Sequence, residues 1–453
     1  MASSMMDSDY FKDMFGREAM RAVFSDDARL EAWLETEVAL AVAQERLGVI
    51  PAGVAEQIKA AARLENFDLP AMKADFDRVG FPILPFVKQL AAACDPEVAR
   101  WVHYGVTTQD ILDTGMVLQA RTGLALVEKD VKGILAALAK LADDHRATVM
   151  AGRTFQQLAA PVTFGYKAAV WLDEFLRHYE RLQEAEERLL TGQCAGGVGT
   201  FATLGDKALD VQRLMMDLLK LKTPDITWHT ARDSWSELLS LFAMMSATLA
   251  KIAGEVVILM RSEVGELSEP FEAGRGASTT LPQKRNPVAC EPVIAIAHRI
   301  RELSASQMTA MIQEHERGGL GQMHLEWMLF PDAFVLLSGS LKHSLFILEN
   351  LCVDAGRMRQ NLDLDGGLIM SEAVMMGLAP KVGKGKAHHL VYAAAGRAIE
   401  QKITLREALL DDPAICEHLT AKEIEALLDP ANYTGSAALM TDQVLEKYKK
   451  GQQ

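Results

Sequence analysis

The sequence is poor in aromatic residues and has fewer basic than acidic side chains, and both shortages exclude classes of protein. Aromatic residues make up 6% of the 453 residues and hydrophobic residues 49%, with 22 methionines, so we expect an aliphatic core. This balance favours packed helices over an all-β sandwich. The 47 Lys and Arg against 61 Asp and Glu give a net charge of −14, which argues against nucleic acid or an anionic membrane as partner. A small anionic substrate is not excluded, because local cations decide that contact.

Cysteine pairs and long apolar runs are missing as well. The five cysteines are odd in number and widely scattered, without a Cys-x-x-Cys pair. Free, mostly buried thiols in a reducing cytosol explain this distribution best. The acidic N-terminus lacks the apolar run of a signal peptide, and no stretch of about 18 uninterrupted apolar residues predicts a membrane span. We therefore expect a soluble, cytoplasmic protein.

Motifs for a metal or a dinucleotide are also absent. No cluster of His, Cys, Asp and Glu has the spacing of metal ligands, so we expect no metal. The glycine-rich segment 195–200 does not follow a predicted strand, which makes it a poor dinucleotide fingerprint. We expect the protein to work without a cofactor.

Long aliphatic stripes with three- and four-residue spacing predict an all-α fold around a bundle of long helices. The predicted long helices cover residues 111–147, 160–191, 231–266, 287–313 and 323–350. Shorter helices on either side divide the chain into an N-terminal helical domain (1–105), a central bundle (106–350) and a C-terminal helical domain (351–453). No sustained alternation of strand type is present.

The segment 276–287 contains the most informative polar residues. Its two prolines prevent a continuous helix, yet helix-forming sequence lies on both sides, so we predict a loop between helices. Backbone amides, Lys284 and Asn286 could surround an anionic group there while Ser278 faces a proton. The simpler alternative is a loop that only connects two helices.

A second polar loop precedes the helix predicted from residue 111. Thr107 and Thr108 either cap that helix, with Asp110 complementing its dipole, or bind a substrate carboxylate together with the free N–H groups of the first turn.

The third polar loop covers residues 152–161. Arg153, Thr154 and Gln157 supply hydrogen-bonding groups ahead of a helix broken by proline, and we predict that they bind substrate. The alternative is a structural turn in which Arg153 makes an ion pair.

Three further residues are candidates for substrate binding. His229 and Arg232 form a pair that either faces the substrate or lies on a helix surface, and His315 lies at a polar helix end that could face the site.

The order Gly276-Ala277-Ser278-Thr279-Thr280-Leu281-Pro282-Gln283-Lys284-Arg285-Asn286-Pro287 resembles the signature loop of the fumarase/aspartase superfamily, Gly-Ser-x-x-Met-Pro-x-Lys-x-Asn-Pro. Ala277 and Leu281 depart from that pattern. The loops at 103–114 and 152–161 resemble the other family motifs, and the likeness covers nearly the whole chain. Family members commonly have a histidine at the position of Phe155, where it serves as general acid or orienting group.

This resemblance implies a three-domain all-α fold and a homotetramer in which each site takes loops from three subunits. It also implies a lyase or cycloisomerase that acts on a di- or tricarboxylate. Ser278 would be the base at the carbon α to a carboxylate, and Lys284 and Asn286 would stabilise the resulting anion. Thr107, Thr108 and Thr154 would help to clamp the substrate carboxylates.

Within the family, the chain is most similar to bacterial 3-carboxy-cis,cis-muconate cycloisomerase. This likeness implies a role in the catabolism of aromatic compounds. The supporting stretches are 228–233, 313–317, 361–364 and 387–390. Cycloisomerases also lack the imidazole at the position of Phe155. Three departures from their pattern leave the substrate open: Gln283, Leu158, and Phe155 itself, which stands where a Trp is expected. The alternatives are a C–N lyase that releases fumarate from an N-substituted aspartate, and a structural homologue without turnover.

Overall fold

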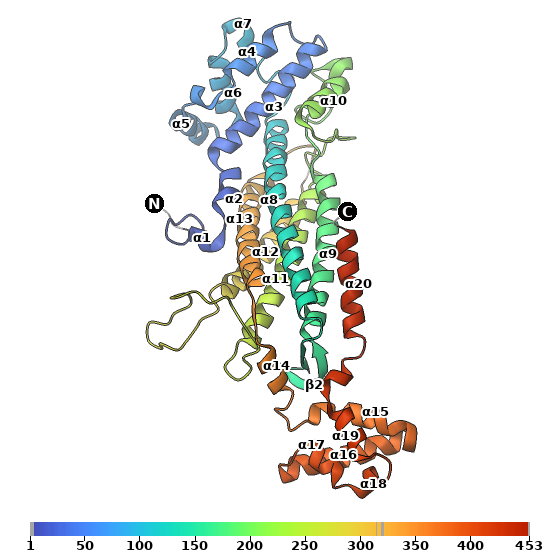
Figure 1. The fold of residues 1–453 in the computed structure, drawn as a ribbon. Coiled ribbons are helices and arrows are strands. Elements are labelled where there is room, and N and C mark those ends of the chain that lie inside the picture. Colours follow the sequence, from blue (N-terminus) through green and yellow to red (C-terminus); the bar gives the residue numbers. More distant parts are fainter. Residues whose placement is uncertain (1–3, 314, 319–320, 452–453) are drawn as a thin grey trace. The chain divides into compact units, whose positions relative to one another are not determined.

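Five long helices dominate the computed structural model, which describes residues 4–313, 315–318 and 321–451. These helices are α8 (Thr108–Asp144), α9 (Phe164–Leu189), α11 (Asp233–Leu259), α12 (Cys290–Ala310) and α13 (Gln322–Glu349), as labelled in Figure 1. Each corresponds to one of the predicted long helices, and the all-α fold is confirmed.

The chain divides into two compact units. The first unit comprises Met1–Val131, His178–Ala247 and Ala295–Lys342, and the second comprises Lys132–Arg177, Thr248–Ile294 and His343–Gln453. The limits of both units fall mostly within the long helices, so each of these helices contributes residues to both. The division into three domains stays a prediction.

The first unit contains the N-terminal helices and their own core. Ser25 accepts the N–H of Ala28 at 3.2 Å and so caps α3 (Asp26–Arg46). The buried face of α3 contributes Trp33, which meets the ring of Phe86 from α6 (Ile83–Ala92) at a centroid distance of 5.5 Å. The other elements of this unit are α1 (Lys12–Phe15), α2 (Glu18–Val23), α4 (Val54–Ala61), η1 (Leu64–Asn66), α5 (Leu69–Val79), α7 (Pro96–Ala99), η2 (Gly205–Lys207) and α10 (Ala208–Leu219).

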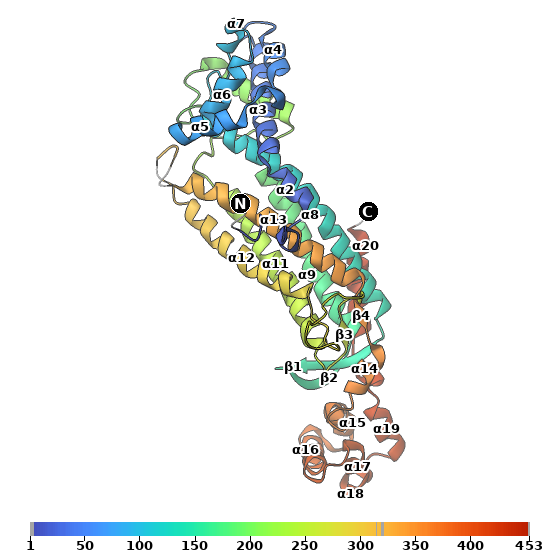
Figure 2. The same ribbon diagram turned by 90° about the vertical axis from the view of Figure 1, so that its left-hand side faces the viewer.

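The second unit contains two small two-stranded sheets and the C-terminal helices, which Figure 2 shows from the side. Two of these helices begin with a complete capping box, formed by Thr404 with Glu407 and by Thr420 with Glu423. The elements are β1 (Val149–Thr154), β2 (Gln157–Thr163), β3 (Leu267–Ser268), β4 (Cys352–Val353), α14 (Ala355–Asn361), η3 (Leu368–Met370), α15 (Ser371–Val382), α16 (Lys384–Gln401), α17 (Leu405–Leu410), α18 (Pro413–Cys416), α19 (Ala421–Leu428), η4 (Pro430–Tyr433) and α20 (Ala437–Lys450).

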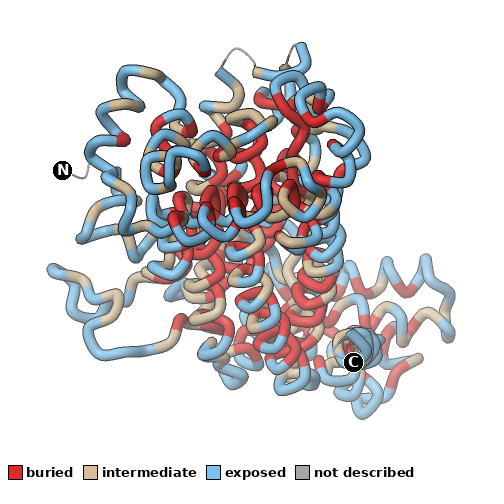
Figure 3. The backbone as a smooth tube through the Cα atoms, turned by 90° about the horizontal axis from the view of Figure 1, so that it is seen from above, coloured by how far each residue is buried: buried red, intermediate tan, exposed pale blue. Residues whose placement is uncertain are grey.

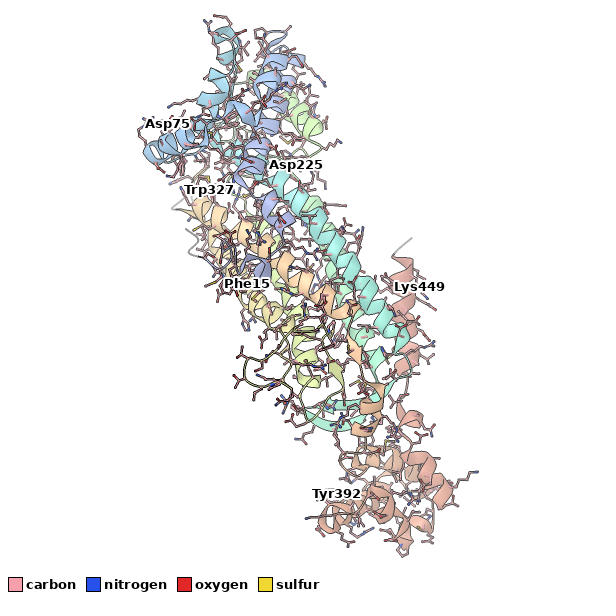
Figure 4. The ribbon with its side chains drawn as sticks, turned by 60° about the vertical axis from the view of Figure 1, so that its left-hand side comes forward. Phe15, Asp75, Asp225, Trp327, Tyr392 and Lys449 are labelled. Carbon is pink, nitrogen blue, oxygen red and sulfur yellow. The ribbon has the colours of Figure 1, made fainter. Side chains whose placement is uncertain are left out.

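Burial follows the aliphatic stripes of the sequence. Buried and exposed residues alternate along the helices, with the buried residues gathered in the interior (Figure 3). Tyr392 on α16, labelled in Figure 4, is 72% exposed, whereas Val391 beside it is buried in the core of α15–α19. One residue along the helix thus separates core from solvent.

The hairpin of β1 and β2 was not predicted. Residues 160–163 were assigned to a helix, but they lie in β2, and α9 begins only at Phe164. The strands are antiparallel, from Val149 opposite Thr163 to Thr154 opposite Gln157, and the two residues between them have positive φ angles of 50° and 66°. Such turns usually carry Asn-Gly or Asp-Gly. Phe155 and Gln156 occupy this turn, so the usual sequence signal is missing.

No membrane span is expected from the sequence, although one helix has the length and apolar composition of a span. Among the described residues, α11 is long and apolar enough by length and composition, with a mean hydropathy of 1.6 in its most apolar window. Half of that window is buried, and Glu255 and Lys251 pair with Lys167 and Glu174 of α9. This is the pattern of a helix packed inside a protein.

All five cysteines are free, as predicted, but their burial differs from the prediction. Cys194 and Cys290 are buried, Cys94 is intermediate, and Cys352 and Cys416 are exposed. Burial raises the pKa of Cys194 well above its ordinary value, so this thiol stays protonated.

Candidate active-site loops

Ser278 lies in a tight turn of the loop that connects β3 with α12, in the second unit. Its Oγ accepts the backbone N–H of Leu281 at 3.0 Å and that of Thr280 at 3.3 Å. Two donors aimed at one hydroxyl oxygen stabilise a negative charge on that oxygen. Ser278 itself is only partly buried, so its hydroxyl is accessible.

The neck of this loop is closed by Gly276 and Asn286. The backbone N–H and the side-chain Nδ2 of Asn286 donate to the Gly276 carbonyl, at 2.9 and 3.0 Å. Gly276 has a φ of +66°, and a Cβ there would lie 2.5 Å from the Asn286 carbonyl oxygen, so the neck requires glycine. The amide that was predicted to bind substrate therefore holds the loop in this structure.

Lys284 differs from the other cations of the loop. Arg285 stacks on Phe271 at 4.0 Å and Arg275 stacks on Phe346 at 3.9 Å from the ring centroids. Lys284 is exposed, and within the described residues it makes no ion pair. It is thus the cation of this loop that is available to an anionic ligand.

In the first unit, Thr107 and Thr108 lie at the N-terminus of the 37-residue helix α8. Asp110 accepts the Thr107 N–H at 3.0 Å, which is half of a capping box. The hydroxyl of Thr107 accepts a hydrogen bond from the exposed guanidinium of Arg317. A hydroxyl, a cation and a helix N-terminus therefore meet at one place.

Asp110 holds three segments of the first unit together. Its carboxylate also accepts the N–H groups of Ala195 at 3.0 Å and Gly196 at 2.8 Å, and it lies 2.9 Å from Nε2 of His229. Asp110 and His229 are completely buried, and Nδ1 of His229 has no described partner. His229 is therefore an interior residue in this structure and does not lie on a helix surface.

Arg232 is buried as well. Its guanidinium bonds to Asp113 at 3.0 and 3.1 Å and to Glu326 at 3.0 and 2.6 Å. Burial alone would lower the pKa of Arg232, but the two carboxylates raise it above its ordinary value. Burial raises the pKa of Asp113, and Arg232 opposes that shift. Arg232 thus neutralises interior carboxylates here, and it does not lie on a helix surface.

The predicted residues of the third loop differ in their surroundings: Arg153 is held by an ion pair, whereas Thr154 and Gln157 lie at the tip of the hairpin. Arg153 forms a bidentate pair with Glu266 at 2.6 and 3.0 Å, which is the ion pair considered as the alternative. Thr154 and Gln157 are exposed at the end of the hairpin, and Phe155 is 99% exposed. The tip is therefore free for contacts outside this unit.

The remaining predicted residue, His315, is exposed with a φ of +66°. Its neighbour Glu314 lies outside the described residues. Arg317, two residues further along the chain, makes the contact to Thr107 described above. Sequence reasoning assigned no role to Arg317, although its place in the polar stretch 313–317 was a signal.

A cavity of about 850 Å³ in the first unit contains none of the predicted site residues. Trp33, Met72, Met323 and Trp327 contribute to its apolar wall; Trp327 is labelled in Figure 4. In the described residues, no group of three or more His, Cys, Asp and Glu side chains could hold a metal ion.

Comparisons with known proteins identify the family of this chain. A family model described as "Lyase" matches residues 15–301, and one described as "Adenylosuccinate lyase C-terminus" matches residues 367–444. The chain is 40% identical to N-acetyl-S-(2-succino)cysteine lyase of Dickeya dadantii, over 100% of this chain and 99% of the relative. It is 43% identical to 3-carboxy-cis,cis-muconate cycloisomerase of Pseudomonas aeruginosa, over 97% and 96%.

A solved structure shows the same fold over the whole length. The 3-carboxy-cis,cis-muconate lactonizing enzyme from Pseudomonas putida superposes with a TM-score of 0.93 at 38% identity, covering 98% of this chain and 100% of that one. The similarity therefore extends across both compact units.

Proposed function

Because the chain belongs to the fumarase/aspartase superfamily and is an enzyme of that superfamily, we propose that it is a cycloisomerase of a small polycarboxylate, most like 3-carboxy-cis,cis-muconate cycloisomerase. The observation that carries this proposal is the arrangement of Ser278. Its Oγ accepts two backbone N–H bonds in a loop whose one uncommitted cation is Lys284.

In the proposed reaction, an oxygen of a substrate carboxylate adds to a carbon–carbon double bond and closes a lactone. The electron pair of that bond moves onto the carbon α to a second carboxylate, and the Ser278 hydroxyl gives its proton to this carbon. A proton from solvent then restores the hydroxyl of Ser278. In reverse, the Ser278 alkoxide removes the proton and the carboxylate leaves. Lys284 stabilises the negative charge that develops on the substrate carboxylate in either direction.

The hairpin tip bears on the nature of the leaving group. It carries Thr154, Phe155 and Gln157, which have no proton to give near neutral pH. An amine leaving group must be protonated as the C–N bond breaks, which requires a general acid. A carboxylate leaves as a stable anion without that help. Phe155 therefore favours a lactone-forming reaction over the C–N lyase.

A thiolate is also a stable leaving anion, and this gives the second candidate. The relative from Dickeya dadantii is named for a substrate with a succinyl group on sulfur. A C–S lyase would use the same base, Ser278, and would release fumarate and a thiol. The C–N lyase stays as the third alternative.

We assign Thr107, Thr108 and Arg317 to a substrate carboxylate, because the Arg317 guanidinium already bonds to the Thr107 hydroxyl. Thr154, Gln157 and His315 are exposed and are assigned to substrate contacts, with sites shared between the subunits of a homotetramer. Exposed apolar residues along the long helices, such as Met244, Ile258 and Met328, fit burial between subunits.

The test is a substrate panel with the assembled protein. Loss of the diene absorbance of 3-carboxy-cis,cis-muconate supports the cycloisomerase, and fumarate from an S-succinyl thiol or an N-succinyl amine supports a lyase. Ser278→Ala should remove the activity, whereas Thr279→Ala, an exposed hydroxyl beside it, should leave it within about threefold, as expected for a residue outside the reacting geometry. Turnover that survives Ser278→Ala refutes the proposal.

A further inference from the structure

Two buried carboxylates lie at the ends of the same short segment, Glu266-Leu267-Ser268-Glu269, and each bonds to one of the candidate loops of the second unit. Glu266 is completely buried and Glu269 is 7% exposed. Between them, β3 pairs with β4, with Leu267 opposite Val353 and Ser268 opposite Cys352. A carboxylate is costly to bury unless its oxygens are satisfied, so the partners of both groups are informative.

Glu269 closes the base of the loop that carries Ser278. Its Oε1 accepts the N–H of Cys290 at 2.7 Å and that of Ala289 at 3.0 Å, and Oε2 lies 3.2 Å from the second of these. These two N–H groups belong to the start of α12, where the helix dipole favours a negative charge. One side chain at the beginning of the loop thus fixes the end of the loop, 20 residues later.

The loop is closed at two places. The contacts of Glu269 with Ala289 and Cys290 close its base, and the contacts between Gly276 and Asn286 close its neck further out. Ser278 and Lys284 lie beyond the second closure, in the segment 277–285. Displacement at the base moves the outer segment as a whole. The N–H donors of Thr280 and Leu281 move together with Ser278. Such a displacement therefore keeps the hydrogen bonds of the serine and changes the position of its hydroxyl relative to a substrate.

Glu266 does the same for the hairpin. Its carboxylate accepts hydrogen bonds from both terminal nitrogens of Arg153. It accepts a third one from Nδ2 of Asn361, at 2.7 Å. Arg153 lies next to Thr154 at the end of β1, so the ion pair fixes the strand that leads to the exposed tip. The same guanidinium donates to the Ala151 carbonyl at 3.2 Å.

We propose that Glu266 and Glu269 are positioning residues of the enzyme, with the segment between them as the common anchor of the two loops. This assignment rests on the proposed function and extends it to residues that do not touch the substrate. Glu269 sets the position of Ser278 and controls the proton-transfer step. Glu266, through Arg153, sets the hairpin tip and controls substrate binding.

The decisive experiment compares kcat and KM for Glu269→Ala, Glu269→Gln and Arg153→Met in the assembled enzyme. Glu269→Ala should lower kcat by about tenfold or more and change KM little, because a displacement of about 1 Å at a reacting group costs up to about 100-fold. Glu269→Gln should recover most of the rate, since its one carbonyl oxygen can accept both N–H bonds. Arg153→Met should raise KM more than it lowers kcat.

Asp412→Ala is the matched control, because Asp412 caps α18 through the N–H groups of Ala414 and Ile415, away from both loops. If Asp412→Ala lowers kcat as much as Glu269→Ala, the effect is general destabilisation and the inference is wrong. Tryptic cleavage after Lys284 gives a second measurement that does not depend on activity. It should be faster in Glu269→Ala than in the unchanged protein, and close to the unchanged rate in Glu269→Gln.

The outcomes separate this inference from the proposed function. Activity that survives Ser278→Ala refutes the proposed function. An inactive Ser278→Ala variant together with unchanged kcat and unchanged cleavage in Glu269→Ala leaves the function standing and refutes the positioning role. A KM for Arg153→Met equal to that of the unchanged enzyme refutes the role of Glu266.

Discussion

Replacing Arg232 with methionine tests the interior network of the first unit. Methionine keeps most of the apolar stem but removes four hydrogen bonds to Asp113 and Glu326. The side chains of all three residues are 1–3% exposed, so water cannot replace the guanidinium. The amides of Gln109 and Gln307 stay as the other described donors to the two carboxylates.

The expected loss of stability is large. Removing one partner of a buried ion pair costs about 3–5 kcal/mol, because it leaves an uncompensated charge in the interior. Two carboxylates share this one cation, so at pH 8 we expect the upper part of that range. The exposed control Arg188→Met, which loses the pair with Glu237, should cost less than about 1 kcal/mol.

The loss should depend on pH with a defined sign. The folded-state pKa of Asp113 is already raised, first by burial, and Arg232 is what holds it down, so it rises further in Arg232→Met. A carboxyl with a raised folded-state pKa adds stability at pH values below its unfolded pKa and loses that stability as pH rises through its folded pKa. The deficit of the variant should therefore shrink as pH falls from 8 to 5, by up to about 1.4 kcal/mol per pH unit for each carboxyl that takes up a proton.

The assay is urea unfolding of the unchanged protein and both variants, at pH 5, 6.5 and 8. A further variant with Asp113→Leu, Glu326→Leu and Arg232→Met together should be more stable at pH 8 than Arg232→Met alone, because no buried charge is then left unpaired. A deficit below about 1 kcal/mol at pH 8, or one that grows toward pH 5, refutes the assignment of Arg232 as the cation that neutralises this interior.

Three further changes test the loops. Gly276→Ala should lower kcat at least about tenfold, because its Cβ would meet the Asn286 carbonyl and the backbone has a positive φ, while the melting temperature changes little. Arg317→Met should raise KM about tenfold through loss of a charge-assisted bond to a substrate carboxylate, whereas Arg317→Lys should recover part of it. Phe155→His should raise the rate on N-succinyl amines relative to lactone formation, by about 10²-fold if the imidazole acts as a general acid; an unchanged ratio of rates contradicts the leaving-group argument.

The long helices could be predicted from the sequence because their periodic burial repeats over many turns. In α11, for example, Trp235, Leu238, Leu239 and Phe242 recur at three- and four-residue spacing, and all are buried. The loop of Ser278 was predictable for a different reason. Two prolines interrupt helix-forming sequence there, which is a local rule that tertiary contacts do not override.

The hairpin and the buried ion network could not be predicted in the same way. A strand of six or seven residues leaves little room for alternation, and the turn at Phe155 and Gln156 lacks the residues that favour positive φ. The burial of His229 depends on its contact with Asp110, and that of Arg232 on its ion pairs with Asp113 and Glu326. Glu326 lies 94 residues away from Arg232 in sequence. No local pattern records such a pairing.

The acidic composition has a meaning that net charge alone does not show. Each candidate loop is held by a carboxylate of the interior: the Thr107 loop by Asp110, the hairpin by Glu266 and the Ser278 loop by Glu269. A carboxylate accepts several hydrogen bonds in fixed directions, so it can join chain segments that are distant in sequence. The residues that meet an anionic substrate must then supply donors and positive charge. In the proposed site, Lys284, Arg317 and the threonine hydroxyls supply them at the exposed ends, while the carboxylates of Asp110, Glu266 and Glu269 stay buried.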